Sequence, residues 1–375
     1  MKISPQDYTY MARAIELAKK GLYTTHPNPR VGCVIVKNDQ VIGEGYHQRT
    51  GQPHAEVLAL QNAGIDAKGA TAYVTLEPCS HTGRTPPCAD GLLDARISRV
   101  VVAMQDPNPL VSGNGIKKLR DAGVDVVVGV LEQQAQDLNK GFIKRMQQGL
   151  PWVRVKMAMS LDGRTAMASG ESQWITASDA RLDVQKYRAS ADAILTGQGT
   201  LLADDPSLNV RLSAEELEIE GKVRQPVRVV LDEDLKMSSQ SKMLSLEGDT
   251  WVYTLSDDAN KKQQLESAGA KIINGTVNTE HYLQLKNILK DMAKREINEV
   301  HVEAGQTLTG ALLQEGLVDE LIIYMAPTLM GSDARGLFNL PLLESMQDRI
   351  HLDIKDIRAI GRDWRIIANP LKITT

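Results

Sequence analysis

Short apolar runs rich in β-branched residues alternate with helical patterns along most of this 375-residue chain. RVVVAM (99–104) and VDVVVGVL (124–131) are typical of buried strands, and GIKKLRDAG between them is typical of a helix. Regular alternation of this kind favours an α/β layer architecture in which much of the sheet is parallel. The sequence therefore predicts an α/β fold with a largely parallel sheet.

The alternation forms two series, which meet at Gly149-Leu150-Pro151. This break ends a helix predicted over 132–148, and the usual prior of roughly 150 residues per domain allows two or three domains. We expect two, 1–148 and 152–375. The second series closes on an antiparallel pair of strands over 351–369.

Two of the expected helices begin with capping patterns. Ser4 is followed by Asp7 three residues later, and Thr176 is followed in the same way by Asp179. A hydroxyl and a carboxylate at this spacing can satisfy each other's free backbone N–H groups. We expect Ser4 to cap the first helix and Thr176 to begin the helix over 178–190.

The overall charge excludes some classes of partner. The net charge is −4, and the 15 Phe, Trp and Tyr residues do not line up with Lys or Arg, so a nucleic-acid stacking platform is not predicted. No run approaches the roughly 18 apolar residues of a membrane span, and the N-terminus lacks the apolar core of a signal peptide. We expect a cytoplasmic protein that contacts neither nucleic acid nor membrane.

Two of the chain's three cysteines lie in TLEPCSHTGRTPPC (75–88). Disulfide, metal site and coincidence are the alternatives, and a reducing compartment argues against the disulfide. Upstream, GQPHAEV places His54 at the start of a helix. His54, Cys79 and Cys88 could occupy three corners of a zinc tetrahedron and leave the fourth to water. Cys33 lies in the apolar run VGCVIV and is expected to be a core residue.

Glu56 follows His54 by two positions. Residues at this spacing do not share a helix face, but in the first turn both can reach a group lying off the end of the helix. An unligated carboxylate beside water on zinc suits a proton shuttle. We therefore favour an open catalytic zinc site with Glu56 as acid and base. A closed zinc site or unrelated buried thiols remain the alternative.

The pattern H-x-E, then P-C and a second Cys, is the signature of zinc-dependent nucleobase deaminases. Here eight residues separate the cysteines, in place of the usual two. With HPNPRVG, GYH and SHTGRTPPC, this longer form resembles the deaminase domain of the bifunctional riboflavin-biosynthesis deaminase/reductase family. The resemblance implies a three-layer cytidine-deaminase-like fold. It also implies substrate contacts from Asn28, His47, His81 and Arg84.

The second half offers two candidate phosphate-binding turns and a buried charge. GQGTLL at Gly197 is a weak dinucleotide signal, and EVHVEAGQTLTGALLQEG predicts a strand, a glycine turn and a helix whose free N–H groups could meet a phosphate. Lys156 lies within an apolar strand, VRVKMAM, where a charge is costly unless paired. We expect Lys156 to pair with Glu303 on a neighbouring strand and to supply a proton in a reductive step. The alternative is that the Lys156 side chain reaches along the strand to the protein surface, where its charge is solvated.

The resemblance extends over this half through VKMAMSLDGRTAMASGESQWIT, RASADAILTGQGTLLADDPSLNVR and VEAGQTLTGALL. It implies a dihydrofolate-reductase-like domain that uses NADPH to reduce a ribosylamino-pyrimidine phosphate. The implied cofactor residues are Ala158, Trp174, Thr200, Asp204, Gly305, Gln306, Thr307, Leu308, Thr309, Gly310 and Ala311. The implied substrate residues are Ser172, Arg188, Leu208, Arg211 and Glu303.

Arg188 and Arg211 suit phosphate, because a guanidinium can grip two oxygens at once. The acidic VVLDEDLKM fits less well, because acid near the adenosine end of the cofactor repels the 2′-phosphate of NADPH.

The sequence thus predicts a bifunctional enzyme of riboflavin biosynthesis. The resemblance implies that residues 1–148 hydrolytically deaminate 2,5-diamino-6-ribosylamino-4(3H)-pyrimidinone 5′-phosphate with Zn²⁺ and that residues 152–375 reduce the ribosyl group to ribityl with NADPH. The family makes a homodimer or homotetramer the expected state. Two alternatives are an RNA-editing zinc deaminase with an appended binding domain and a ligand-sensing protein without turnover. The first lacks a basic surface, and the second has no use for Glu56.

Overall fold

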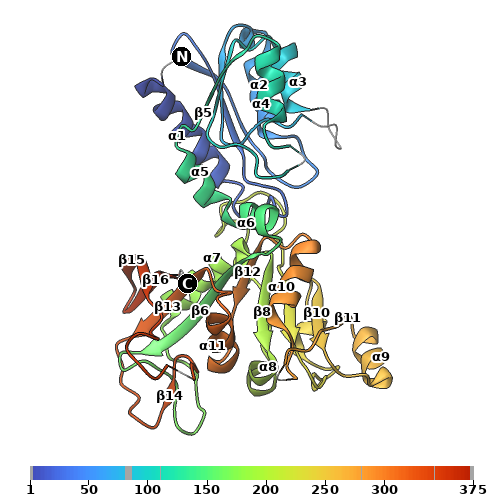
Figure 1. The fold of residues 1–375 in the computed structure, drawn as a ribbon, viewed down its shortest axis with the longest axis vertical. Helices are drawn as coiled ribbons and strands as arrows, with labels where there is room; N and C mark the ends of the chain where they lie inside the picture. Colours follow the sequence, from blue (N-terminus) through green and yellow to red (C-terminus); the bar gives the residue numbers. More distant parts are fainter. Residues whose placement is uncertain (1–2, 81–86, 110, 280, 342, 372–375) are drawn as a thin grey trace. The chain divides into compact units, whose positions relative to one another are not determined.

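The computed structural model describes residues 3–371 apart from 81–86, 110, 280 and 342 (Figure 1). The chain divides into two compact units, Met1–Gly149 and Leu150–Thr375, each built on its own sheet. In the described part of the chain, no helix is long and apolar enough to cross a bilayer.

The first unit contains a five-stranded sheet in the order β2-β1-β3-β4-β5. β3, β4 and β5 are mutually parallel, whereas β1 is antiparallel to both of its neighbours. The strands are β1 (Gly32–Lys37), β2 (Gln40–Tyr46), β3 (Thr71–Val74), β4 (Arg99–Val102) and β5 (Asp125–Val128). The helices are α1 (Pro5–Lys19), α2 (Ala55–Ala63), the short 3-10 helix η1 (Gly64–Ala67), α3 (Cys88–Asp94), α4 (Asn114–Asp121), α5 (Glu132–Leu138) and α6 (Lys140–Gln148).

Helices cover both faces of this sheet, which gives three layers. Alternate residues of β1 point to opposite faces. Cys33 and Ile35 pack in the core under α2, α3 and α4, whereas Val34 and Val36 pack under α1 and α5. Figure 1 shows the two groups of helices on either side of the strands. The α/β three-layer prediction is therefore confirmed.

The single helix predicted over 132–148 is two helices, because α5 ends before Asn139 and α6 begins after it. The Asn139 side chain is buried; its Oδ1 accepts the N–H of Arg30 and its Nδ2 donates to the carbonyl of Arg30. An Asn side chain that bonds distant backbone in this way competes with the local helical pattern.

The second unit contains a nine-stranded sheet in the order β11-β10-β9-β8-β12-β6-β13-β16-β15. The first seven strands of this order are parallel to one another. β16 then pairs antiparallel with β13, and β15 pairs antiparallel with β16. The prediction of a mostly parallel sheet is confirmed. The strands are β6 (Trp152–Ser160), β7 (Arg164–Ala166), β8 (Ala193–Gly197), β9 (Val227–Leu231), β10 (Thr250–Thr254), β11 (Ala270–Asn274), β12 (Glu299–Val302), β13 (Glu320–Ala326), β14 (Arg335–Gly336), β15 (Leu352–Ile360) and β16 (Asp363–Pro370).

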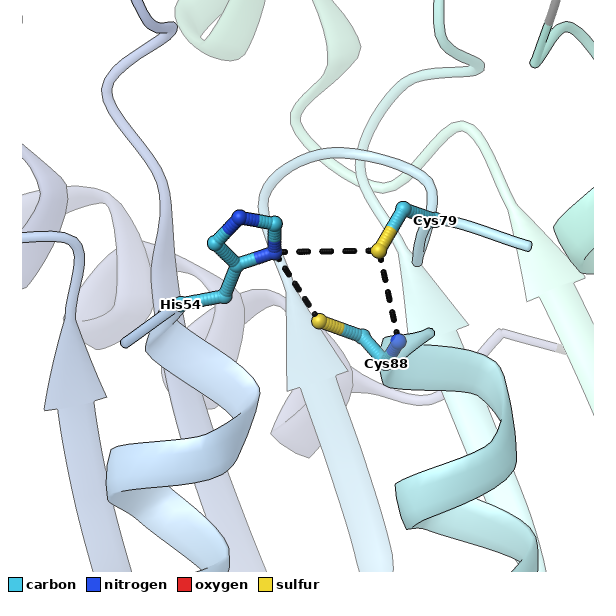
Figure 2. Close-up of side chains that lie close together, drawn as sticks. All are labelled: His54, Cys79 and Cys88. Atoms are coloured by element: carbon cyan, nitrogen blue, oxygen red, sulfur yellow. Dashed lines mark hydrogen bonds between the residues drawn. The ribbon is translucent and has the colours of Figure 1, made fainter. Parts of the chain in front are cut away.

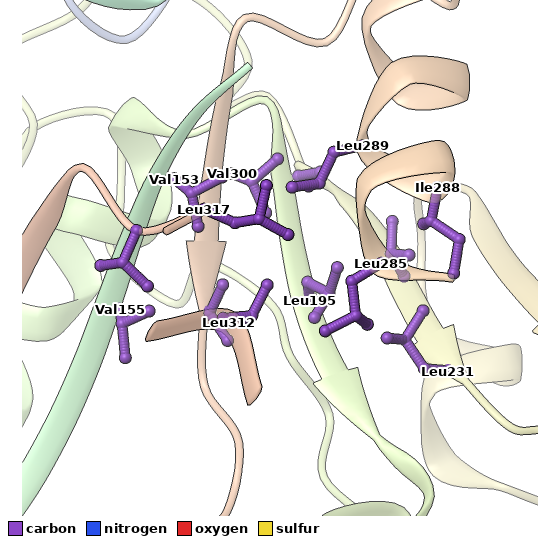
Figure 3. Close-up of a cluster of buried hydrophobic side chains, with 14 of the residues drawn as sticks. Val153, Val155, Leu195, Leu231, Leu285, Ile288, Leu289, Val300, Leu312 and Leu317 are labelled. Carbon is purple, nitrogen blue, oxygen red and sulfur yellow. The ribbon is translucent and has the colours of Figure 1, made fainter. Parts of the chain in front are cut away.

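The two faces of this sheet differ in character. One face packs against α10 (Leu285–Lys294) and α11 (Gln306–Gln314) through an aliphatic cluster that includes Val153, Leu195 and Val300 (Figure 3). The opposite face meets apolar side chains of α7 (Ser178–Ser190), α8 (Gln198–Asp204) and α9 (Ala259–Ser267). The 3-10 helix η2 (Lys242–Ser245) contributes Met243 to this second cluster. Under α7 the sheet also carries buried charged residues, which matter for the second candidate site.

Candidate active sites

His54, Cys79 and Cys88 converge at one end of the first sheet (Figure 2). Their ligand atoms all lie within 4.8 Å of one another. His54 Nδ1 is 3.1 Å from Cys88 Sγ and 3.7 Å from Cys79 Sγ. Among the described residues, no fourth His, Cys, Asp or Glu joins this group.

Each ligand stands where its element begins or ends. His54 is the N-cap of α2, Cys88 is the first residue of α3 behind Pro87, and Cys79 follows β3. The backbone N–H of Cys88 donates to Cys79 Sγ across 3.3 Å. Helix N-termini favour thiolates, because free N–H groups and the helix dipole stabilise negative charge. Hydrogen bonding from Cys88 and His54 lowers the pKa of Cys79 to about 4.

The three ligand atoms fit zinc in type and spacing. One imidazole nitrogen and two sulfurs are a donor set that zinc uses in catalytic sites, with the remaining position open. Zn–S and Zn–N bonds of about 2.3 and 2.0 Å at tetrahedral angles place N and S roughly 3.5 Å apart. The separations of 3.1 and 3.7 Å bracket that value.

Glu56 lies in the first turn of α2 and is only 3% exposed. Burial raises the pKa of its carboxyl to about 7, and the negative charge of Cys79 adds to the effect. Glu56 is not part of the three-residue ligand group. A buried carboxyl with a pKa near neutrality can both accept and donate a proton.

Of the four residues implied as substrate contacts in this unit, two lie beside the ligands. Asn28 Nδ2 and His47 Nε2 are 3.1 Å apart, and the ring of His47 meets that of His54 edge-on at 5.6 Å. Burial lowers the pKa of His47, which favours its neutral form. His81 and Arg84 lie outside the described residues.

Glu77 is a buried carboxylate at this site that the sequence analysis missed. It lies two residues before Cys79, is 3% exposed and accepts four backbone N–H groups. Two of these donors, Gly115 and Ile116, open α4. A Cβ on Gly115 would lie 1.9 Å from the carbonyl oxygen of Pro78, so only glycine lets α4 approach this closely. Glu77 and Gly115 together hold the backbone that precedes Cys79.

In the second unit, two glycine turns lead from adjacent parallel strands into helices. β8 runs into α8 at Gly197, and β12 runs into α11, whose N-cap is Gly305. A Cβ on Gly305 would lie 4.0 Å from Thr200 Oγ1, so the two turns face each other. Nucleotides bind outside the carboxyl ends of parallel strands at such positions. The implied cofactor residues Thr200 and 305–311 are thus brought together.

Glu303 directly follows β12, and its partner differs from the one predicted. Arg188 donates from Nε to Glu303 Oε1 at 2.6 Å and from Nη2 to Oε2 at 2.8 Å. The predicted Lys156–Glu303 ion pair is not formed among the described residues. Lys156 and Glu303 are nevertheless the residues that follow the last register pair of β6 and β12, Val155 with Val302. Burial lowers the pKa of Lys156; Glu303 opposes this effect and Arg188 reinforces it. Arg188 holds the pKa of the Glu303 carboxyl well below its usual range despite burial.

The remaining implied residues of this unit lie on β6 and around α7 and α8. Trp174 is 69% exposed, with the Arg181 guanidinium 4.7 Å above its ring. Asp204 accepts from Gln173 Nε2 at 3.3 Å. Arg211 bonds through its backbone N–H to Gln185 Oε1. Ala158 lies on β6, Ser172 lies between β7 and α7, and Leu208 is buried after α8.

The acidic segment after β9 is bonded within the protein. Asp232 is fully buried and accepts from Gln198 Nε2 and from the backbone N–H groups of Lys236 and Met237. Glu233 Oε1 accepts the N–H of Leu283. Asp234 forms an exposed ion pair with Lys236. Asp232 therefore serves the turn after β9.

The first unit thus has the layers and ligand set of a zinc-dependent deaminase, and the second has the strand ends and turns of a nucleotide-binding α/β domain. Residues 4–104 match the family model described as the cytidine and deoxycytidylate deaminase zinc-binding region. Residues 151–366 match the RibD C-terminal domain.

Relatives match over nearly the full chain. The riboflavin biosynthesis protein RibD of Escherichia coli K12 is 52% identical over 365 residues, which are 96% of this chain and 98% of the relative. The structure of Acinetobacter baumannii RibD, form 1, superposes with a TM-score of 0.90 at 48% identity and covers 98% of this chain and 99% of that chain. A deaminase/reductase crystal structure from Thermotoga maritima gives 0.85 at 34% identity, with 97% and 99% covered.

The chain belongs to the RibD family of riboflavin biosynthesis proteins. It is a bifunctional enzyme that joins a zinc-binding deaminase domain to a reductase domain. This membership favours the bifunctional enzyme over the RNA deaminase and the ligand-sensing protein that the sequence left open.

Proposed function

We propose that the first unit hydrolytically deaminates the diaminohydroxyphosphoribosylaminopyrimidine named for the Thermotoga relative and that the second reduces 5-amino-6-(5-phosphoribosylamino)uracil with NADPH. The observation that carries the proposal is the convergence of one imidazole nitrogen and two sulfurs beside a buried, unligated Glu56. A purely structural zinc site would use a fourth protein ligand and no such carboxylate.

In deamination, His54, Cys79 and Cys88 would hold Zn²⁺, which supplies a Lewis acid that activates water. Glu56 takes a proton from the water and delivers it to the amino nitrogen that leaves as ammonia. Its pKa of about 7 suits both transfers at neutral pH.

Around Glu56, four residues are proposed to bind the substrate. Asn28 Nδ2 donates to Nε2 of the neutral His47, whose Nδ1–H donates to the carbonyl of Pro53. Asn28 can then accept through Oδ1 and donate through its second N–H at the polar edge of a pyrimidine. His81 is proposed on the same side, and Arg84 at the ribose phosphate.

In reduction, the C1′–O bond of the sugar ring opens as the N–H proton passes to the ring oxygen, which leaves an open-chain imine. NADPH would supply the hydride that reaches C1′ of this imine. Lys156, whose pKa burial lowers, donates the proton to the nitrogen attached to that carbon. Glu303 orients the substrate, and Arg188 and Arg211 bind its phosphate. Ser172 and Leu208 complete the proposed substrate contacts. The proposed cofactor residues are Ala158, Trp174, Thr200, Asp204 and the turn and first helical residues 305–311.

The proposal extends to the organisation of the chain. We assign residues 1–148 to the deaminase domain and 152–375 to the reductase domain, and we place the enzyme in the cytoplasm, where thiols stay reduced. We also propose a homodimer or homotetramer. The edge strand β15 and its neighbour β16 carry Ile354, Ile357 and Trp364 on one face, each at least 45% exposed. Light scattering of the purified chain checks this, and a monomer at micromolar concentration would contradict it.

Glu56→Gln tests the deaminase mechanism. The amide keeps the size of the carboxyl but cannot take up the proton, so ammonia release should fall at least 100-fold. Zinc content should stay at one ion per chain, because Glu56 is not among the three ligands. Ammonia release and metal content are measured on the same preparation.

The reductase unit of the same variant is the internal control. NADPH oxidation with 5-amino-6-(5-phosphoribosylamino)uracil should equal that of the unmodified chain. Normal ammonia release from Glu56→Gln would refute the assigned proton transfer.

A further inference from the structure

His301 lies in the middle of β12 with its ring fully buried. Neither ring nitrogen has a hydrogen-bond partner among the described residues. A buried polar group without a partner destabilises the fold, because its bonds to water are lost and not replaced. An aliphatic residue at this position, like the Val300 and Val302 that flank it on the strand, would avoid that cost. We therefore look for a role of the His301 imidazole that an aliphatic side chain such as valine could not fill.

The ring cannot move far from this position. Tyr187 of α7 stacks on it, with ring centroids 6.3 Å apart and planes 7° from parallel. The guanidinium of Arg154 lies 5.3 Å from the centroid of Tyr187, and Arg154 is itself ion-paired with Glu320 and Glu299. Burial lowers the pKa of His301; Glu303 opposes this effect, and Arg154 and Arg188 reinforce it. The lowered pKa favours the neutral ring, which carries one N–H.

Glu303, two residues further along the chain and just past the end of β12, brings its carboxylate close to this ring. His301 Nε2 is 3.4 Å from Glu303 Oε1, just beyond the distance of a good N–H···O bond. The same Oε1 accepts from Arg188 Nε at 2.6 Å. Arg188 Nε and His301 Nε2 thus both face one oxygen of Glu303, and in this structure Arg188 forms the hydrogen bond to it.

A substrate phosphate bound by Arg188 would compete with Glu303 for the same cation. The pair would loosen, because the guanidinium then serves two anions. His301 is placed to hold the Glu303 carboxylate when Arg188 turns toward the phosphate. A shift of a few tenths of an ångström would shorten the 3.4 Å separation of His301 Nε2 and Glu303 Oε1 to a hydrogen bond.

We propose that His301 is a positioning residue for the reductase, which donates from Nε2 to Glu303 when the substrate's phosphate engages Arg188. Glu303 then keeps its orientation toward the sugar while its ion pair weakens. The inference rests on the proposed roles of Glu303 and Arg188 in reduction.

His301→Met and His301→Gln form a matched pair of variants. Both are unbranched and similar in length, but only Gln can place an N–H near the position of Nε2. In the full-length zinc enzyme, His301→Met should lower kcat/KM for 5-amino-6-(5-phosphoribosylamino)uracil by about 10-fold or more. KM for NADPH and ammonia release by the deaminase site should stay unchanged. His301→Gln should recover most of the loss.

A double-mutant cycle shows whether the effect passes through Glu303. In a Glu303→Gln background, His301→Met should cost less than about twofold, because the carboxylate that it positions is already gone. A Met variant with normal kinetics overturns the inference. Equal losses in Met and Gln, or a full loss in the Glu303→Gln background, also overturn it by indicating a packing role.

Two further outcomes are distinguishable. If His301→Met does not fold, His301→Asn takes its place, because the shorter Asn amide stays polar but does not reach Glu303. Reductase activity of His301→Asn equal to that of His301→Gln would then refute the donor role. If the unmodified chain does not oxidise NADPH with this pyrimidine, the proposed function fails and takes the inference with it.

Discussion

Two buried carboxylates flank the metal ligands, and they differ in what surrounds them. Glu56 and Glu77 are each 3% exposed. Glu77 accepts four backbone N–H groups, which satisfy its charge within the fold. Burial without comparable compensation raises the pKa of Glu56 to about 7. The carboxylate of Glu77 is thus tied to the backbone, whereas that of Glu56 is placed for proton transfer.

Glu77→Gln should loosen the segment that presents Cys79. An amide NH₂ would face backbone N–H groups that need an acceptor, and at least one of the four bonds would be lost. We expect the deaminase unit to lose about 2–3 kcal/mol of stability and to release zinc at lower urea concentration. Zinc release to a chromophoric chelator during urea titration measures both effects.

Glu16→Gln is the matched control, since Glu16 is exposed and pairs with Lys19 on the surface of α1. It should change stability by less than about 1 kcal/mol. Equal zinc-release curves for the two variants would show that Glu77 does not support the site.

At this scale, the sequence shows ligand types and spacing but not contacts between distant segments. His54, Cys79 and Cys88 could be proposed together as zinc ligands, because their residue types and the helix starts beside them can be recognised from the neighbouring sequence alone. Glu77 could not, because its partners lie in 106–116. The Arg188–Glu303 pair joins residues 115 positions apart. The cost of an unpaired charge in an apolar strand favoured the wrong partner, Lys156, because the sequence does not show how close Arg188 lies to Glu303.

At the scale of elements, helix starts also show that local contacts can be predicted from the sequence whereas contacts with distant segments cannot. The Ser4–Asp7 capping box of α1 was predicted and is present. The Thr176 cap was wrong: the N-cap of α7 is Ala177, and its N–H is accepted by Asp363 of β16. A carboxylate from a distant strand can replace a local cap, and a sequence pattern cannot exclude such a substitute.

Asp7 does more than cap α1. Its buried carboxylate also accepts from Arg99 of β4 and from the Tyr73 hydroxyl of β3, so it ties the helix to the sheet. Burial alone would raise its pKa, but the bonds from Arg99, Ser4 and Tyr73 outweigh burial and lower it from 3.8 to about 2. Because the folded pKa is the lower one, the stabilisation is complete above about pH 4 and is lost as pH falls through about 2.

Asp7→Asn should therefore weaken α1 in a pH-dependent way. At neutral pH we expect a loss of about 1–2 kcal/mol, and the difference from the unmodified chain should shrink at about pH 3. Hydrogen exchange of the 5–19 segment, measured by mass spectrometry and corrected for intrinsic rates, reports this locally. A difference that stays constant down to about pH 2.5 would rule out the ionised carboxylate as its source.

At the scale of the whole molecule, each unit has its own sheet and its own apolar cores. A domain boundary at Gly149-Leu150-Pro151 could be proposed from the sequence, because a glycine and a proline end a helix that the following residues do not continue. The two units can also be followed separately in solution. The chain's 4 tryptophans, at 152, 174, 251 and 364, all lie in the second unit, whereas the metal ligands all lie in the first.

Truncation after Gly149 should leave a folded deaminase unit, because the two cores that enclose its sheet consist of residues before that point. The fragment should bind one zinc, release ammonia from the diaminopyrimidine nucleotide and release zinc within about 0.5 M of the urea midpoint of the full chain. In the full chain, tryptophan fluorescence should follow a second transition that zinc removal does not shift. An insoluble fragment, or a tryptophan transition that moves with zinc content, would mean that the units do not fold independently.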